Sequence, residues 1–376
     1  MKNLILIALV ISLATSSFSQ RQKVYSIIKQ PQSVEWYTNQ YKLWSDLLEK
    51  EPKNAEAWQN AYIALRMIKI FNAKKTQKDL DVFIKKMQKS IPNTYEYHFL
   101  TNYNGNNSDS LFSHVQKAFA MNPKRTEVYP DLLTYYVLKD NRKEIKKYSD
   151  IWFNANDYSP NILNFGYNIL ASCEDNSVLI TNGDNDTYPL IIVQNAMNFR
   201  RDVNVLNIYL LKQKNYRDKV FSRLKVKLFN KLESDFENQY EFMKAIVRHL
   251  EVHLGIPLYY SSTVNAGIYK SSKKDTYIVG LALQYCKKNF DNIAVLKKNV
   301  EQNFRLDYLL NTFFNDISSS IVTRSNDAYL VGFLTLYSHY KVSGDIKKQL
   351  KMRKLLEKLA ETSSNSAYIL NYLKKS

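Results

Sequence analysis

The feature that most constrains this chain is a run of amphipathic helical segments that recur between residues 30 and 170. Residues 34–50 carry aromatic and aliphatic side chains at helical spacing after Ser33, a residue type well suited to cap a helix. Residues 57–68 place alanines on the apolar side of a second segment, and small side chains let two helices approach closely. The pattern predicts consecutive pairs of packed helices.

Prolines recur between these segments, where one helix is expected to end and another to begin, at Pro52, Pro92, Pro123 and Pro160. In this respect the region 30–170 resembles tetratricopeptide-repeat (TPR) proteins, whose unit is a helix hairpin of about 34 residues. The resemblance implies a helical solenoid with a concave surface that binds another protein. Several tyrosines are candidates for that surface, although some must fill the core: Tyr62, Tyr95, Tyr97 and Tyr135.

The first nineteen residues predict export. Lys2 precedes an apolar stretch at 4–14, and small residues follow it before Gln20. This order is typical of a cleaved signal peptide, so we expect a periplasmic or secreted protein that begins at Gln20. The apolar stretch is shorter than the roughly 20 residues that span a bilayer, and no later stretch is long enough, so the mature chain should have no transmembrane segment.

The formal net charge is +18, which usually indicates a nucleic acid or an anionic surface as partner. Export argues against a nucleic acid, and lysine outnumbers arginine, the side chain better suited to reading phosphates and bases. Two interpretations remain open: binding to an anionic glycan or lipid of the envelope, or a solvated basic surface. The two cysteines, Cys173 and Cys286, also leave open a disulfide or two buried thiols.

From residue 178 the apolar periodicity changes. The run 178–181 reads as a strand, 188–199 as a helix with Pro189 in its first turn, and 203–211 as a second strand. Strand, helix and strand in this order predict a parallel βαβ unit with a right-handed crossover. Further strands are expected at 256–264 and 277–286.

Helices return near the C-terminus, where 327–341 and 346–361 predict a hairpin closed by Gly344. The fold class predicted is therefore mainly α with a small α/β module: a TPR-like helical solenoid, a short sheet containing a parallel βαβ unit, and a C-terminal helix hairpin. The expected boundaries are a signal peptide at 1–19, a TPR-like domain at 20–172, an α/β module at 173–290 and a helical domain at 291–376.

The loop "TNGDNDTYPL" at 181–190 is followed by "RRDVNVLNIYLL", "IPLYYSSTV", "GLALQY" and a hairpin around "SGD". This order resembles the soluble C-terminal region of bacterial protein O-mannosyltransferase-like (glycosyltransferase-C-like) membrane proteins, over about 178–360. The resemblance implies an envelope context connected with glycans. That family's presumed transfer chemistry lies in a membrane half that this chain lacks, so transferase activity does not follow. Ile191 and Ile192 also stand where relatives carry aromatics.

The same loop is the main candidate site. Ligands of open parallel sheets bind beyond the carboxyl ends of the strands, and this loop is expected at that edge. Two carboxylates and an amide suit calcium or magnesium, with Asp184 and Asp186 as the metal ligands. The alternative is structural: the carboxylates cap the next helix and pair with lysines. The candidate ligand-binding residues are Asp184, Asn185, Asp186, Thr187, Lys212 and Lys214.

Other chemistry is less well supported. His249 and His253 lie four residues apart on an expected helix, but no third zinc ligand is evident. The basic segment 200–231 could hold an anionic chain or form a solvated helix face. No catalytic residues are predicted. We therefore favour a non-enzymatic adaptor that binds an envelope protein or glycan-related partner, and keep open a sugar-binding or glycosyl-transfer auxiliary or enzyme acting at the loop.

Overall fold

The computed structural model describes residues 20–71, 75–105, 108–311, 313 and 315–375. The predicted signal peptide lies outside the described residues. By its internal contacts the chain divides into two compact units, Met1–Tyr135 and Tyr136–Ser376, and the boundaries expected after 172 and 290 both fall within the second. Among the described residues, no helix combines the length and apolar character needed to cross a membrane.

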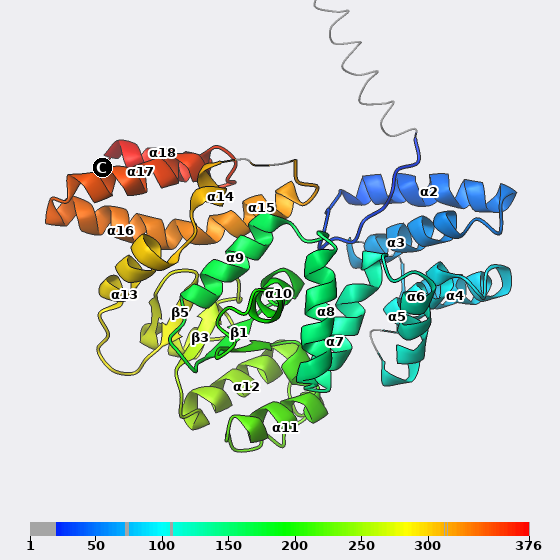
Figure 1. Ribbon diagram of the computed structural model, residues 1–376, viewed down its shortest axis with the longest axis horizontal. Coiled ribbons are helices and arrows are strands. Elements are labelled where there is room, and N and C mark those ends of the chain that lie inside the picture. Colours follow the sequence, from blue (N-terminus) through cyan, green and yellow to red (C-terminus); the bar gives the residue numbers. More distant parts are fainter. Residues whose placement is uncertain (1–19, 72–74, 106–107, 312, 314, 376) are drawn as a thin grey trace, which may run out of the picture. The chain divides into compact units, whose positions relative to one another are not determined.

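The first unit is built from helix hairpins (Figure 1). Pro52 lies in the turn of the first hairpin, Pro92 in that of the second and Pro123 in that of the third. This regular placement confirms the TPR-like repeat. The helices are α2 (Val34–Lys50), α3 (Ala55–Phe71), α4 (Gln77–Ser90), α5 (Tyr95–Asn104), α6 (Phe112–Met121) and α7 (Tyr129–Leu138), the last of which spans the unit boundary.

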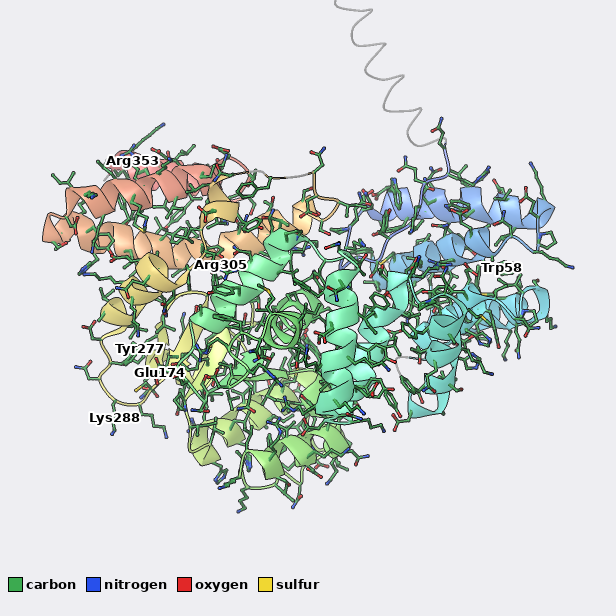
Figure 2. The ribbon with its side chains drawn as sticks, viewed as in Figure 1. Trp58, Glu174, Tyr277, Lys288, Arg305 and Arg353 are labelled. Atoms are coloured by element: carbon green, nitrogen blue, oxygen red, sulfur yellow. The ribbon has the colours of Figure 1, made fainter. Side chains whose placement is uncertain are left out.

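Helix α3 is the core of this unit. Its alanines Ala57, Ala61 and Ala64 are completely buried, as expected for helices that approach closely. Trp58, labelled in Figure 2, contacts the ring of Phe83 on α4 edge to face, with centroids 5.0 Å apart. The helix therefore joins the first hairpin to the second.

The expectation that tyrosines line a binding surface is wrong for three of the four residues. Tyr62, Tyr95 and Tyr97 are buried, because their rings fill the space between helices. Tyr135 is partly exposed and stacks on Phe112. Of these four tyrosines, Tyr135 is therefore the one that remains a candidate for a protein-binding surface.

The second unit holds a five-stranded sheet of order β2-β1-β3-β5-β4. β1 pairs in parallel with β2 on one side and β3 on the other, which confirms the parallel βαβ unit. β5 then runs antiparallel to both β3 and β4. The strands are β1 (Val178–Thr181), β2 (Asn204–Asn207), β3 (Leu258–Ser261), β4 (Thr276–Ile278) and β5 (Ala282–Tyr285).

Three expected strands are shorter in the structure. The run at 256–264 forms a strand only over Leu258–Ser261. The run at 203–211 ends as a strand at Asn207, because its side-chain oxygen accepts the backbone N–H groups of Tyr209 and Leu210 and turns the chain. The run at 277–286 is broken at Gly280, which has φ +147° and lies against Ser172 and a phenylalanine ring. The two halves become the antiparallel strands β4 and β5.

Helices cover this sheet and extend from it. The first two of them, α8 and α9, follow one another with Pro160 at the start of α9, and each packs on α10. The helices are α8 (Arg142–Asn154), α9 (Pro160–Ala171), α10 (Tyr188–Ala196), α11 (Lys214–Arg223), α12 (Gln239–His253), α13 (Asn292–Lys298), α14 (Asp307–Leu310), α15 (Ser319–Asn326), α16 (Leu330–Ser343), α17 (Ile346–Ala360) and α18 (Ser366–Lys375).

The C-terminal hairpin is confirmed. α16 and α17 pack side by side, with α18 beside α17 (Figure 1). Gly344 ends α16 with φ 73°, a left-handed conformation that glycine adopts without strain. One apolar core joins the hairpin to the sheet, and it includes Leu179, Tyr259, Leu336 and Leu356.

Candidate functional site

The loop after β1 lies at the point where the strand order of the sheet reverses. The chain passes from β1 to β2 on one side and later reaches β3 on the other side of β1. Ligands of such sheets bind beyond the carboxyl ends of the strands at this switch point. The residues that lie there form the switch-point cluster, namely Thr181, Asp184, Asp186, Thr187, Asn207, Ser261 and Thr263.

Asp186 links the two strands that flank the switch point. Its Oδ1 accepts the backbone N–H of Gly183 at 2.6 Å, and its Oδ2 accepts that of Asn182 at 2.8 Å. From the β3 side, the hydroxyl of Thr263 donates to the same Oδ2. Burial raises the pKa of Asp186, against the effect of these hydrogen bonds. The amides it accepts precede it in the chain, so these bonds close its own loop and do not cap α10.

Hydroxyl and amide groups from all three parallel strands complete the cluster. The hydroxyls of Thr181 and Thr187 are 2.7 Å apart, and the Asn207 side-chain amide donates to Thr187 Oγ1 at 3.0 Å. On β3, the hydroxyls of Ser261 and Thr263 are 2.8 Å apart. One group of hydrogen bonds thus joins the carboxyl ends of β1 and β2, and a second joins that of β3 to Asp186.

Asp184 differs from the other residues of the switch-point cluster. Its side chain is partly buried, and among the described residues its carboxylate has no hydrogen-bond or ion-pair partner. Burial, and secondly the neighbouring charge of Asp186, raise the pKa of Asp184 to about 6. Nearby on the β3 side, the hydroxyl oxygen of Ser262 is buried and has no hydrogen-bond partner among the described residues. An unpaired carboxylate that titrates near neutral pH is typical of functional sites.

Aromatic side chains lie beside Asp184, and two of them, Trp152 and Tyr158, come from outside the predicted loop. Burial, followed by the charge of Asp184, raises the pKa of Tyr158, which precedes α9. The ring of Trp152 lies 5.0 Å from that of Tyr158 and 5.7 Å from that of Tyr188, centroid to centroid. Ile191 and Ile192, which stand in place of aromatic residues after Leu190, are buried. No local pattern marks Tyr158, because its proximity depends on how α8 and α9 pack on α10.

The two lysines predicted for this site have other partners. Lys212 Nζ donates to Gln239 at 2.9 Å and pairs with Glu233 at 3.2 Å, and Lys214 pairs with Asp218 one helical turn away. Asn185 occupies the middle of the short turn formed by residues 184–186 and is partly exposed. Within the described ranges, no group of three or more His, Cys, Asp or Glu side chains is placed to hold a metal ion. The cation hypothesis therefore rests on Asp184 and Asp186 alone.

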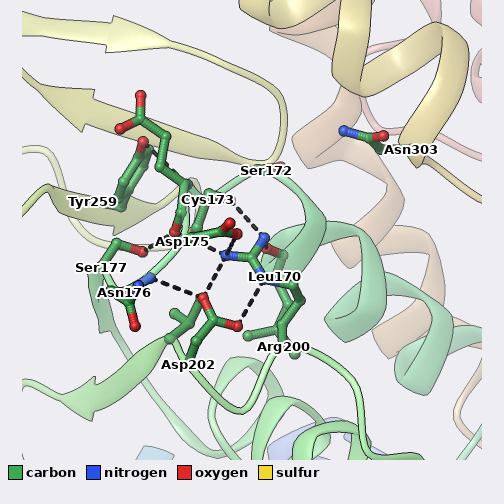
Figure 3. Close-up of polar contacts among 12 residues, drawn as sticks. Leu170, Ser172, Cys173, Asp175, Asn176, Ser177, Arg200, Asp202, Tyr259 and Asn303 are labelled. Atoms are coloured by element: carbon green, nitrogen blue, oxygen red, sulfur yellow. Dashed lines mark hydrogen bonds and ion pairs between the residues drawn. The ribbon is translucent and has the colours of Figure 1, made fainter.

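A second polar cluster lies at the opposite, amino end of the same strands, around Arg200 (Figure 3). The Arg200 guanidinium donates to Asp202 at 3.0 and 2.9 Å and to the backbone carbonyl of Cys173 at 2.7 Å. It also donates to the carbonyls of Leu170 and Glu174. The hydrogen bond from Arg200 is the main cause that lowers the pKa of Asp202. This Arg200 cluster fastens the end of α9 to the start of β1 and β2.

The basic segment, the histidine pair and the two cysteines make structural contacts or stay unpaired with each other. In the basic segment 200–231, Arg217 is completely buried and donates to backbone carbonyls, including that of Leu211 at 2.9 Å. His249 Nε2 lies 2.6 Å from the carbonyl of Lys227, and its ring lies 4.4 Å from that of His253. Cys173 and Cys286 are free thiols.

The comparisons with known proteins concern this same region. Residues 162–315 match the family model of the TMEM260-associated domain 2. The match contains both polar clusters and the whole sheet. It overlaps the region 178–360 in which the sequence resembles O-mannosyltransferase-like proteins, but it ends before α16 and α17. No curated protein matches the chain significantly.

Among solved structures, the chain is similar to the crystal structure of the yeast protein Tom70. The TM-score is 0.30 and the sequence identity is 13%. The alignment covers 93% of this chain and 60% of Tom70, so this chain spans less than two thirds of that protein.

Proposed function

We propose that this protein is an exported, non-enzymatic adaptor of the cell envelope that binds a protein partner through its N-terminal helix hairpins. The observation that carries the proposal is the regular succession of hairpins, each with its proline in the turn. Stacked hairpins present extended surfaces, and such surfaces are the usual means by which repeat proteins act. The TMEM260-associated match and the resemblance to O-mannosyltransferase-like proteins support a partner connected with glycosylated exported proteins.

Export is tested by sequencing the N-terminus of the protein purified from its native host. We expect the chain to begin at or within a residue or two of Gln20, because the charged and apolar segments before it read as a signal peptide. A cytoplasmic protein that retains Met1 would contradict the envelope assignment.

Partner binding is tested by cross-linking the chain from residue 20 onward in envelope extracts of the native host. Two lysine-rich helices provide matched reporters. We expect cross-links to the partner from exposed lysines of α4, such as Lys78, Lys85 and Lys89, and none from those of α17, such as Lys347, Lys351 and Lys354. Cross-links confined to α17 would move the binding surface to the C-terminal hairpin.

A second function is favoured by the unpaired carboxylate of Asp184: binding of a neutral sugar or other polyol at the switch-point cluster. Carboxylate, hydroxyl and amide groups are the hydrogen-bonding partners that sugar hydroxyls require, and the rings of Tyr158 and Tyr188 lie beside them. Calorimetric titration with a panel of neutral hexoses tests this function. Binding should be lost in Asp184→Asn and kept in Asp175→Asn, a change at the exposed rim of the Arg200 cluster.

A further inference from the structure

The described chain begins with an extended segment, residues 20–25, that lies on the first helix hairpin. We call this the N-terminal segment. It is held by three side chains that form the docking face: Gln40 and Trp44 on α2 and Asn60 on α3. All three are buried. The N-terminal segment is therefore held by polar side chains that are buried in the hairpin.

The docking face holds the segment mainly through hydrogen bonds to its backbone. The Gln40 amide donates to the carbonyl of Gln20 at 3.0 Å and accepts the N–H of Gln22 at 2.8 Å. Trp44 Nε1 donates to the carbonyl of Gln22 at 3.0 Å, and Asn60 Oδ1 accepts the N–H of Val24 at 2.7 Å. Alternate residues are thus bound through backbone groups, as in the addition of a strand to a sheet.

Side-chain selection is limited to a few positions. Val24 is 1% exposed and is the single buried side chain of the N-terminal segment. Lys23 is exposed and lies 3.9 Å from Glu127, and the guanidinium of Arg21 lies over the ring of Trp44. The face therefore suits an extended stretch in which two basic residues, one residue apart, precede a branched aliphatic residue.

Gln40 and Asn60 make an occupant necessary. Their amides are buried between helices. Without an extended backbone on the face, both amide atoms of Gln40 and the Oδ1 of Asn60 would lose these partners. The N-terminal segment itself is weakly anchored, because a single side chain of it is buried and one short turn at 26–29 connects it to the rest of the unit. The docking face requires the backbone groups of an extended peptide, and the segment that supplies them is weakly anchored. Another extended peptide could therefore replace the N-terminal segment.

We propose that the docking face is a binding site for an extended peptide of the partner, and that the N-terminal segment fills it until that peptide replaces it. This inference rests on the proposed protein-binding function and names both the chemistry of the ligand and the means of its control. The partner peptide is expected to carry the pattern basic, any residue, basic, branched aliphatic.

The test uses the chain from residue 20 onward and a fluorescent peptide copying residues 20–27, measured by fluorescence anisotropy. Val24→Asp in the protein should free the face, because a carboxylate cannot occupy the buried site of the valine. We expect this variant to bind the peptide saturably, and the unchanged chain to bind it about 10-fold more weakly because its own segment competes.

Two N-methylated peptides provide the matched control for backbone recognition. Methylation of the Gln22 nitrogen removes a bonded N–H, whereas methylation of the Arg21 nitrogen removes one that makes no hydrogen bond among the described residues. The first should bind the Val24→Asp variant about 5- to 10-fold more weakly, the loss expected for one hydrogen bond, and the second should bind normally. Equal binding of the two, or no saturable binding by a folded variant, would overturn the proposal.

Hydrogen exchange covers the case in which Val24→Asp does not fold. In the unchanged chain, the amides of Gln22 and Val24 should exchange by local opening, well before the amides at the centre of α3. If both sets of amides exchange together, the N-terminal segment is a permanent part of the core, and the proposal is overturned. A dimer that dissociates when peptide is added would assign the face to a second copy and not to a partner. None of these assays needs the native partner, so a failed cross-linking experiment leaves this inference independently testable.

Discussion

Two polar clusters stand at opposite ends of the same parallel strands, and they differ in how their charges are satisfied. At the amino end, the Arg200 guanidinium donates to Asp202 and to three backbone carbonyls. At the carboxyl end, Asp184 has no partner among the described residues. The pKa of Asp202 is lowered, mainly by Arg200, whereas that of Asp184 is raised to about 6, mainly by burial.

The opposite pKa shifts have opposite consequences for stability. A carboxyl with a lowered pKa stabilises the fold above its unfolded pKa, and this contribution is lost as the pH falls. A carboxyl with a raised pKa destabilises the fold once the pH exceeds both pKa values. The amino end is therefore arranged for stability, and the carboxyl end retains a charge that a stability argument alone does not explain. Such a charge is expected where a protein binds a ligand.

The largest effect should follow removal of Arg200. Arg200→Ala leaves the carbonyls of Leu170, Cys173 and Glu174 without this donor and removes the charge partner of Asp202. We expect the free energy of unfolding to fall by about 3 kcal/mol, measured by urea denaturation at pH 7.5. The neighbouring Arg201 is exposed, so Arg201→Ala should change stability by less than about 0.5 kcal/mol. Similar losses of unfolding free energy in the two variants would show that Arg200 does not hold α9 to the strands.

A smaller loss is expected from Asp186, the structural member of the carboxyl end. In Asp186→Asn an amide NH2 replaces one oxygen, so a donor must face the N–H of Gly183 or Asn182. Stability should fall by about 2 kcal/mol. Asn185→Ala in the same turn is the control and should leave stability within about 0.5 kcal/mol, since Asn185 is partly exposed. An unchanged melting temperature in Asp186→Asn would contradict its role in joining β1 to β3.

The fold could be predicted from the sequence where local signals agree with packing. Ser33 caps α2 as expected, by accepting the N–H of Trp36, and the predicted limits of the first helix and first strand match those observed. Strand ends were less predictable, because Asn207 and Gly280 stop apolar runs whose composition favours strands. In both cases a turn-forming residue overrides the apolar pattern.

The candidate site was predicted in part. The loop itself could be placed at the strand edge, because parallel pairing fixes where strand ends lie. The charge partners of Lys212 and Lys214 could not be predicted, since these lysines contact Gln239, Glu233 and Asp218. Tyr158 and Thr263 were missed because their proximity depends on packing between distant segments.

Asp184→Asn should do the reverse of the first two changes and stabilise the protein. An unfolded aspartate titrates near pH 3.9, and in the fold the pKa of Asp184 is about 6. Stability is therefore lost as the pH rises between these values, and the ionised carboxylate remains unfavourable above pH 6. Because the side chain is only partly buried, we expect a gain of about 1 kcal/mol at pH 7.5.

The pH dependence distinguishes this effect from an unrelated one. The advantage of Asp184→Asn should vanish near pH 4, where the folded carboxyl is already protonated. Asp175→Asn, at the amino end, changes a carboxylate that is 88% exposed and should shift stability by less than about 0.5 kcal/mol at either pH. If both variants respond to pH alike, the charge of Asp184 is not the source of the difference between the two ends.

The smallest effect concerns calcium. A divalent cation offsets the charge of Asp184 beside Asp186. In the part of the chain that the structure describes, no third acidic or histidine ligand joins these two carboxylates, so they can bind the cation only weakly. With a Kd on the order of 10 mM, 10 mM calcium should stabilise the chain by about 0.4 kcal/mol. Calorimetry and melting curves should show this in wild type and Asp175→Asn, and not in Asp184→Asn/Asp186→Asn. No heat of calcium binding in the wild type would exclude the cation. If a hexose still binds, Asp184 would then act as an acceptor for sugar hydroxyls. The two ends of the strands would in that case differ because one of them hydrogen-bonds a ligand, and not because it binds a metal.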